Sequence, residues 1–193
     1  MNIAALLPHV EVFGGVRRYI EMGNALVRRG HRFTLFTPEG APPAWLAFAG
    51  AMRPFSELGR ETFDVGLCSE YSILEEYDRL RAREKFFYFV LEGHKREREV
   101  ARRDFRFLGN SEGICRRMET RYRITCHRAP GGVNPAIFHP LEPPEREPRA
   151  DGEFRILCYG RIYKRRKGVD AVIRAVEGLH RSRPNVRLIL FDS

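Results

Sequence analysis

The sequence predicts an α/β protein with a doubly wound, mostly parallel sheet, and three observations lead to this prediction. Short apolar runs alternate with segments of helical spacing along residues 1–139. The opening unit runs strand, glycine turn, helix and strand, which is the crossover that parallel strands require. The same order starts again after a Pro-rich stretch. We therefore expect a Rossmann-like domain at 1–139, a linker at 140–153, and the first β-α-β unit of a second Rossmann-like domain at 154–193.

The opening unit has the clearest pattern. "NIAALL" at 2–7 is typical of a buried strand, and "RFTLFTP" at 32–38 is a second strand closed by Pro38. Between them lies a helix that ends near Gly30, whose apolar residues recur at helical spacing: Val16, Tyr19, Ile20, Leu26 and Val27.

The alternation continues up to residue 139. Ser111 is a suitable N-cap for the helix that follows it. We expect helices at 70–85, 95–104 and 112–122 and strands at 63–67, 86–91, 105–110 and 124–130. The helix at 70–85 is predicted from its many charge pairs at i to i+4 spacing.

The composition changes at 140–153, where four prolines and mixed charges without an apolar period predict a linker. A strand at 154–160, a helix at 168–183 and a strand at 186–191 follow. One β-α-β unit cannot bury both faces of its own strands. We therefore expect the chain to be a truncated piece of a two-domain protein, and a partner chain that completes the sheet is the alternative.

The composition is that of an ordinary soluble globular protein, with 43% hydrophobic and 31% charged residues. No apolar stretch reaches 18 residues and no signal segment opens the chain, so we expect a cytoplasmic protein. The four cysteines, Cys68, Cys115, Cys126 and Cys158, have no zinc-type spacing, and we expect them to be reduced and buried.

The net charge of +9 is unevenly distributed. Residues 94–128 hold eleven Lys or Arg against five acids, which is +6 of the excess. Such a segment favours phosphate groups, polyanions or an anionic membrane face, and does not choose among them.

Two glycine-containing loops stand between a strand and a helix. In "FGGVRR", Gly14 and Gly15 let a ligand approach the backbone at a helix N-terminus, which favours an anion, although a Gly-Gly turn is also simply a tight turn. In "GRIYKRRKG", Arg161 follows a strand and Lys167 precedes a helix, so the two cations suit a diphosphate. The sequence has neither GxGxxG nor a P-loop, which argues against nicotinamide cofactors and P-loop ATP hydrolysis.

Four segments in this order resemble the retaining glycosyltransferases of family 4, also called group 1 glycosyl transferases, which have the two-domain GT-B fold. They are "GGVRRYIEMGNALVRRGHRFTLFTP", "NSEGICRRMETRY", "APGGVNPAIFHP" and "ILCYGRIYKRRKGVDAVIRAV". The resemblance implies a hexosyltransferase that moves a sugar from a UDP- or GDP-linked donor to a saccharide or lipid-linked acceptor, with retention and without a metal or other cofactor. It also implies a role in cell-surface polysaccharide or glycolipid synthesis.

The resemblance also implies residue roles. Arg161 and Lys167 would hold the donor diphosphate, and Gly14 and Gly15 would lie against the phosphate and the reacting sugar in the cleft between the domains. His94, in the loop after a strand, would be the catalytic-site residue at the sugar.

Two positions and one missing element depart from the family or leave a choice open. Glu92 is the alternative acid beside His94, and a loop histidine is also commonly a plain surface residue. Asn134 stands where the family has an aspartate. The family's E-x7-E element has no counterpart in the sequence, so we expect the chain alone to have little transferase activity.

The sequence leaves two other classes of function to weigh against the transferase. "KREREVARRDFRF" predicts a basic module for anionic lipid at the inner face of a membrane, or a solvated helix face, since acids interleave with its bases. Nucleic-acid binding has no recognisable signature in the sequence. We therefore expect a nucleotide-sugar donor, an acceptor and a membrane surface as partners, and no nucleic acid.

Overall fold

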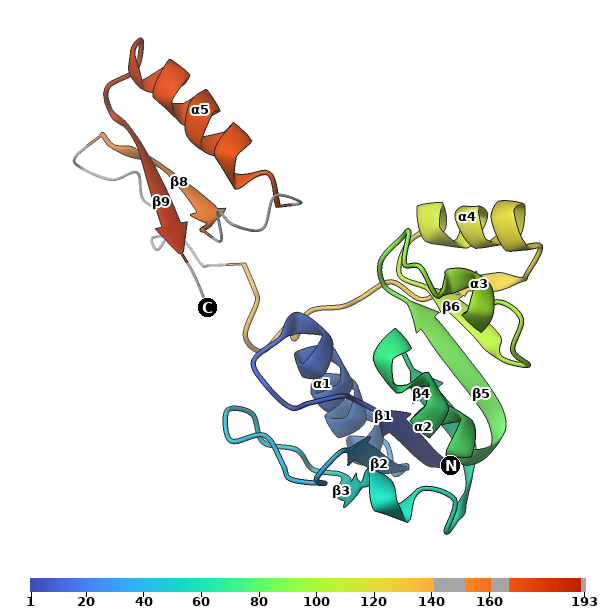
Figure 1. Cartoon of the computed structure of the whole chain (residues 1–193). Coiled ribbons are helices and arrows are strands. Elements are labelled where there is room, and N and C mark those ends of the chain that lie inside the picture. The colour runs from blue at the N-terminus through green and yellow to red at the C-terminus, as the bar shows by residue number, and fades with distance from the viewer. Residues whose placement is uncertain (141–151, 161–166, 192–193) are drawn as a thin grey trace. The chain divides into compact units, whose positions relative to one another are not determined.

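The computed structural model describes residues 1–140, 152–160 and 167–191. The chain forms two compact units, Met1–Asn134 and Pro135–Ser193, which are described separately below (Figure 1). Most of the predicted linker, residues 141–151, lies outside the described residues, as does the basic loop 161–166 with Arg161.

Unit 1, Met1–Asn134, contains one sheet of seven strands that are all parallel. The strand order is β3-β2-β1-β4-β5-β6-β7. Strands β2 and β3 therefore lie on one side of β1, and β4 to β7 lie on its other side. The strands are β1 (Asn2–Leu6), β2 (Arg32–Thr37), β3 (Ala51–Pro54), β4 (Thr62–Cys68), β5 (Arg81–Phe89), β6 (Arg106–Gly109) and β7 (Cys126–Arg128).

Helices cover both faces of this sheet, which confirms the α/β, doubly wound prediction and a Rossmann-like arrangement (Figure 1). On one face Val16 and Ile20 of α1 pack with Ala5 of β1, and on the other Tyr77 of α2 and Met118 of α4 belong to a second core cluster. The helices are α1 (Gly14–Arg28), α2 (Leu74–Arg79), α3 (Glu97–Val100) and α4 (Glu112–Tyr122), with 3-10 turns η1 (Phe55–Glu57) and η2 (Tyr71–Ile73).

Helix α4 begins and ends as the sequence predicts. The Ser111 hydroxyl accepts a hydrogen bond from Ile114 N at 3.2 Å, so the predicted N-cap is confirmed. Arg123 follows the helix in the left-handed conformation, with φ at 60°, and its N–H donates to Glu119 O. A backbone N–H at the start of the helix and a backbone carbonyl at its end therefore each have a hydrogen-bond partner.

The structure corrects the predicted helix at 70–85. Only η2 and α2 form there, and β5 begins five residues before the predicted strand. The charges that suggested helical pairs instead pair between strands: Arg83 with Asp64 at 3.6 Å, and Arg106 with Glu84 at 2.5 Å. Cross-strand ion pairs and i to i+4 pairs need the same residue types, so composition alone does not separate them.

Two further elements differ from the prediction. The helix predicted at 95–104 is the single turn α3, and the flanking Arg96 and Arg103 pair with Glu75 and Asp78 of α2. Strand β3 was not predicted, since its four residues "AMRP" lack an apolar run and end in proline.

Unit 2 contains a parallel pair, β8 (Phe154–Tyr159) and β9 (Val186–Phe191), joined by α5 (Val169–His180). This is the predicted strand, helix and strand order. Among its described residues only Val169 and Val186 are buried hydrophobics. Large apolar side chains of both strands are exposed, including Phe154, Leu157 and Phe191.

Candidate functional site

The carboxyl edge of the unit 1 sheet is where a ligand site is expected. In open α/β sheets ligands bind beyond the carboxyl ends of the strands, next to the point where the strand order reverses. Here that point lies between β1 and β4. The loop that leads to Gly14 follows β1, and the loop that carries His94 follows β5, so both lie at this edge. Since β4 alone separates β1 from β5, these strands are about 10 Å apart.

Gly14 and Gly15 are the first two residues of α1, and both are exposed. Phe13 precedes the helix without a side-chain cap, and the first turn contains no acid. A Cβ added at either glycine would meet no atom within 4 Å, so packing inside the unit does not require glycine there. The first-turn N–H groups of a helix attract anions. The site thus offers open backbone donors to a negatively charged ligand.

His94 is exposed, and its ring is fixed in orientation. The ring stacks on Tyr71 with centroids 3.8 Å apart and planes 15° apart. Its Nδ1 accepts a hydrogen bond from Arg96 N at 3.2 Å, which places the proton of the neutral ring on Nε2. In its neutral form His94 therefore presents Nε2–H as a hydrogen-bond donor.

Glu97 holds the backbone of the His94 loop. Its buried carboxylate accepts hydrogen bonds from the N–H groups of Gly93 and His94, from Tyr122 Oη at 2.9 Å and from Arg117 Nη2 at 3.1 Å. Burial by itself would raise the pKa of Glu97, but the hydrogen bonds from Tyr122, Arg117 and Gly93 outweigh burial and the pKa is lowered. The carboxylate is a charged anchor for this loop.

Two residues at the reversal point were missed by sequence reasoning. His9 follows β1 with its Nδ1 buried and unpartnered among the described residues, and its ring lies 5.0 Å from Phe13. Glu70 follows β4, where burial raises its pKa and His9 opposes that change. Titratable residues directly after buried strands were the signal that could have found them.

Of the remaining predicted site residues, Lys167 lies in unit 2, next to Gly168. Gly168 precedes α5 with φ at 67°, a left-handed conformation that favours glycine. The Lys167 ammonium lies 5.4 Å from the centre of the Tyr159 ring. Asp170 occupies the first turn of α5, whereas α1 has no acid there. Arg161 lies outside the described residues.

Glu92 is exposed, and Asn134 donates a hydrogen bond to Glu21 of α1 at 3.0 Å. Asn134 thereby ties the segment after β7 to α1, a contact within unit 1 that does not need an aspartate.

The four cysteines are free thiols, and Cys68, Cys115 and Cys126 are buried as predicted, while Cys158 is half-buried. Burial raises the pKa of the Cys68 thiol to about 12. The described residues contain no group of three or more His, Cys, Asp or Glu side chains placed to hold a metal ion. In the same part of the chain, none of the helices has the length and apolar character needed to cross a membrane.

No protein-family model matches the chain, and no curated protein matches it.

Proposed function

We propose that the chain is a retaining glycosyltransferase of the GT-B type that takes a hexose from a UDP- or GDP-sugar to a saccharide or lipid-linked acceptor without a metal. The observation that carries the proposal is a repeated arrangement, one copy in each unit. In β1-α1-β2 and in β8-α5-β9, glycine stands where a parallel strand leads into a helix. Two such helix starts suit a donor whose leaving group is a diphosphate.

The helix start in unit 2 is the proposed diphosphate site. Helix α5 starts directly after Gly168, and Ala171 N and Val172 N donate to Gly168 O at 3.0 and 3.3 Å. The N-terminus of a helix attracts anions. Lys167 adds a positive charge directly before this turn. Arg161, the second proposed diphosphate ligand, is assigned from the sequence alone.

The unit 1 edge is proposed to face the reacting sugar. Gly14 and Gly15 offer backbone N–H groups, and His94 offers Nε2–H. A hexose presents hydroxyl oxygens that accept from such donors. The leaving diphosphate gains negative charge as the bond to the sugar breaks, so fixed donors and cations favour the transition state over the ground state.

The alternative reading as a basic membrane-binding module has less support. Arg96 pairs with Glu75 at 2.5 Å and with Glu99 at 2.7 Å, and Arg103 pairs with Asp78 and Glu99. These cations are engaged within unit 1. No observation favours this second function over the first.

Calorimetric titration with UDP, GDP and a panel of their hexose conjugates tests the proposal, with NAD⁺ and ATP as other nucleotides. We expect a UDP or GDP compound to bind, and Lys167→Ala to weaken its binding roughly tenfold, since a charge-assisted hydrogen bond is worth about 1.5–3 kcal/mol. Arg174→Ala is the matched control, because Arg174 is an exposed cation further along α5. Equal losses in both variants, or no UDP or GDP binding, would contradict the proposed function.

A further inference from the structure

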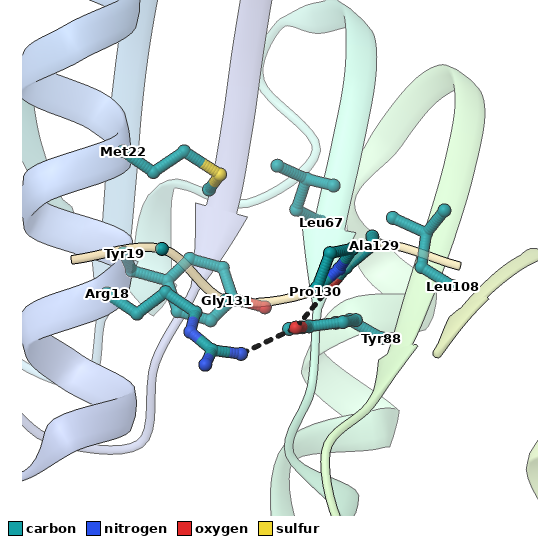
Figure 2. A pocket seen from close by; sticks show the side chains of 10 residues that line it. Arg18, Tyr19, Met22, Leu67, Tyr88, Leu108, Ala129, Pro130 and Gly131 are labelled. Atoms are coloured by element: carbon teal, nitrogen blue, oxygen red, sulfur yellow. Dashed lines mark hydrogen bonds between the residues drawn. The ribbon is translucent and has the colours of Figure 1, made fainter. Parts of the chain in front are cut away.

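A cavity of about 250 Å³ lies in unit 1 between α1, the sheet and the segment that follows β7 (Figure 2). Met22, Leu67 and Leu108 line one part of it, and Arg18 and Tyr88 line another, as Figure 2 shows. Leu67, Tyr88 and Leu108 stand near the carboxyl ends of β4, β5 and β6. The cavity is thus at the sheet edge where open α/β folds bind ligands, and it is mostly apolar.

Arg18 brings a positive charge into this cavity. Its Nη1 donates to Tyr88 Oη at 2.5 Å and to Asn110 Oδ1 at 3.2 Å, and both acceptors are neutral. No carboxylate pairs with it among residues 1–140, 152–160 and 167–191, whereas its neighbour Arg17 pairs with Glu21 at 3.4 Å. A half-buried cation of this kind gains from an anionic partner.

The guanidinium of Arg18 is held in place by a network of neutral groups. Tyr88 Oη lies 2.7 Å from Ala129 O and 2.9 Å from Asn110 Oδ1, and Gly131 N donates to the same Asn110 oxygen at 3.3 Å. A Cβ on Gly131 would lie 2.0 Å from Arg18 Nη2, so a side chain at this position would displace the guanidinium from where it lies. Arg18 is therefore positioned in advance, and binding an anion does not require ordering it first.

The volume limits the apolar part of a ligand. An apolar cavity of about 150 Å³ holds a benzene-sized molecule, and complete drug-sized ligands occupy about 300–1,000 Å³. The cavity of unit 1 falls between these values. It has room for one ring or a short alkyl chain and is too small for a nucleotide.

We propose that this cavity binds a small amphipathic anion, with a ring or short alkyl group against Met22, Leu67 and Leu108 and a phosphate or carboxylate group on Arg18. The binding site is inferred from the cavity and Arg18 alone. Its role as the place of an anion-bearing acceptor rests on the proposed transferase function.

Phenyl phosphate is the probe, titrated into the full chain by calorimetry beside phenol and inorganic phosphate. We expect phenyl phosphate to bind at least tenfold more tightly than either, because only phenyl phosphate uses both parts of the site. Arg18→Gln should weaken phenyl phosphate binding tenfold or more. Arg17→Gln is the matched control on the same helix and should bind as the wild type does. Lys167→Ala should also leave phenyl phosphate binding unchanged, which separates this cavity from the diphosphate site.

Met22→Trp provides a second test that keeps Arg18 and fills the cavity. It should weaken phenyl phosphate binding by a similar factor and leave the weak binding of inorganic phosphate unchanged. Equal phenyl phosphate affinity in the wild type, Arg18→Gln and Met22→Trp would overturn the inference, as would the lack of saturable binding at millimolar concentration. Binding of phenyl phosphate without binding of UDP or GDP would support this site and contradict the proposed function. Binding of UDP or GDP without binding of phenyl phosphate would support the proposed function and contradict this site.

Discussion

The β1-α1-β2 part of unit 1 and the β8-α5-β9 part of unit 2 have the same local design and different surroundings. In both, a helix connects two parallel strands that pair in register. Leu35 of β2 is fully buried, whereas Leu157 of β8 is 67% exposed. Ile20 of α1 is fully buried, while Val169 is the sole buried residue of α5.

The difference shows that burial comes from neighbouring elements and not from the β-α-β pattern. One helix covers one face of two strands, whereas unit 1 adds five more strands and helices on the second face. An apolar strand is stabilised only when both faces are covered. The sequence shows that each strand is apolar, and the surrounding elements decide how much its apolar side chains contribute to stability.

Leucine-to-alanine substitution in the two units should give the largest difference. Leu35→Ala should lower the free energy of unfolding by about 2–5 kcal/mol, because it leaves a cavity in a close-packed core. Leu157→Ala makes the same chemical change at an exposed position and should cost no more than about 0.5 kcal/mol. Urea unfolding followed by circular dichroism measures both, and similar losses would contradict the comparison.

Removing the buried charge of Glu97 should have the next largest effect. Glu97→Gln keeps the size of the side chain and weakens the bonds from Arg117 and Tyr122. We expect a loss of about 2 kcal/mol, since hydrogen bonds to a charged group contribute about 1.5–3 kcal/mol. Glu112→Gln is the control, because the exposed Arg116–Glu112 pair is worth about 0.3–0.5 kcal/mol. Comparable losses in the two variants would show that Glu97 is not an anchor.

The same carboxylate should make unit 1 sensitive to acid. The folded pKa of Glu97 is lowered from its ordinary value of 4.5, so its contribution is fully present above pH 4.5. That contribution is lost as the pH falls from 4.5 through the lower folded pKa. Unfolding measured from pH 7 to pH 3 should therefore show the gap between wild type and Glu97→Gln narrowing below pH 4.5. A gap that stays constant across this range would rule out the titration of Glu97 as its source.

Replacing a helix glycine by alanine should change the stability of the two units by smaller amounts and in opposite directions. A Cβ on Gly23 of α1 would lie 2.8 Å from Phe48 and 2.9 Å from Phe33, while one on Gly178 of α5 would meet no atom within 4 Å. Gly23→Ala should therefore destabilise by about 1 kcal/mol, because overpacking exceeds the gain in helix propensity. Gly178→Ala should stabilise by up to about 1 kcal/mol. Thermal unfolding would measure both, and a stabilising Gly23→Ala would contradict the close packing of α1.

The sequence predicts those features that depend on local pattern. β1 follows from its apolar run, and α4 from Ser111 and the residues after it. The strand β5 was partly missed because Arg83 and Glu84 find their partners on neighbouring strands, which only the folded sheet brings near.

The candidate site divides in the same way. Gly14 and Gly15 were predicted from their place between a strand and a helix, and His94 from the family resemblance; the structure places all three at the carboxyl edge of the unit 1 sheet. Arg18, Tyr88 and Asn110 were missed. Tyr88 lies 70 residues after Arg18 in the chain and Asn110 lies 92 residues after it, so they meet only because the strand order brings them together. The Nδ1 of His9, which has no hydrogen-bond partner in the part of the chain that the structure describes, likewise becomes visible only when its surroundings are known.

We propose that the glycine-led helix starts of the two units take part in binding a nucleotide-diphosphate sugar. Backbone-amide NMR of the full chain tests it most directly, during titration with UDP- and GDP-hexoses and with UMP and GMP as controls. We predict that one of the diphosphate donors shifts the amides of Gly168 and Val169 in unit 2 and of Gly14 and Gly15 in unit 1, and that the monophosphates shift them far less. Unchanged amides at both helix starts, or equal shifts with the monophosphates, would contradict the claim.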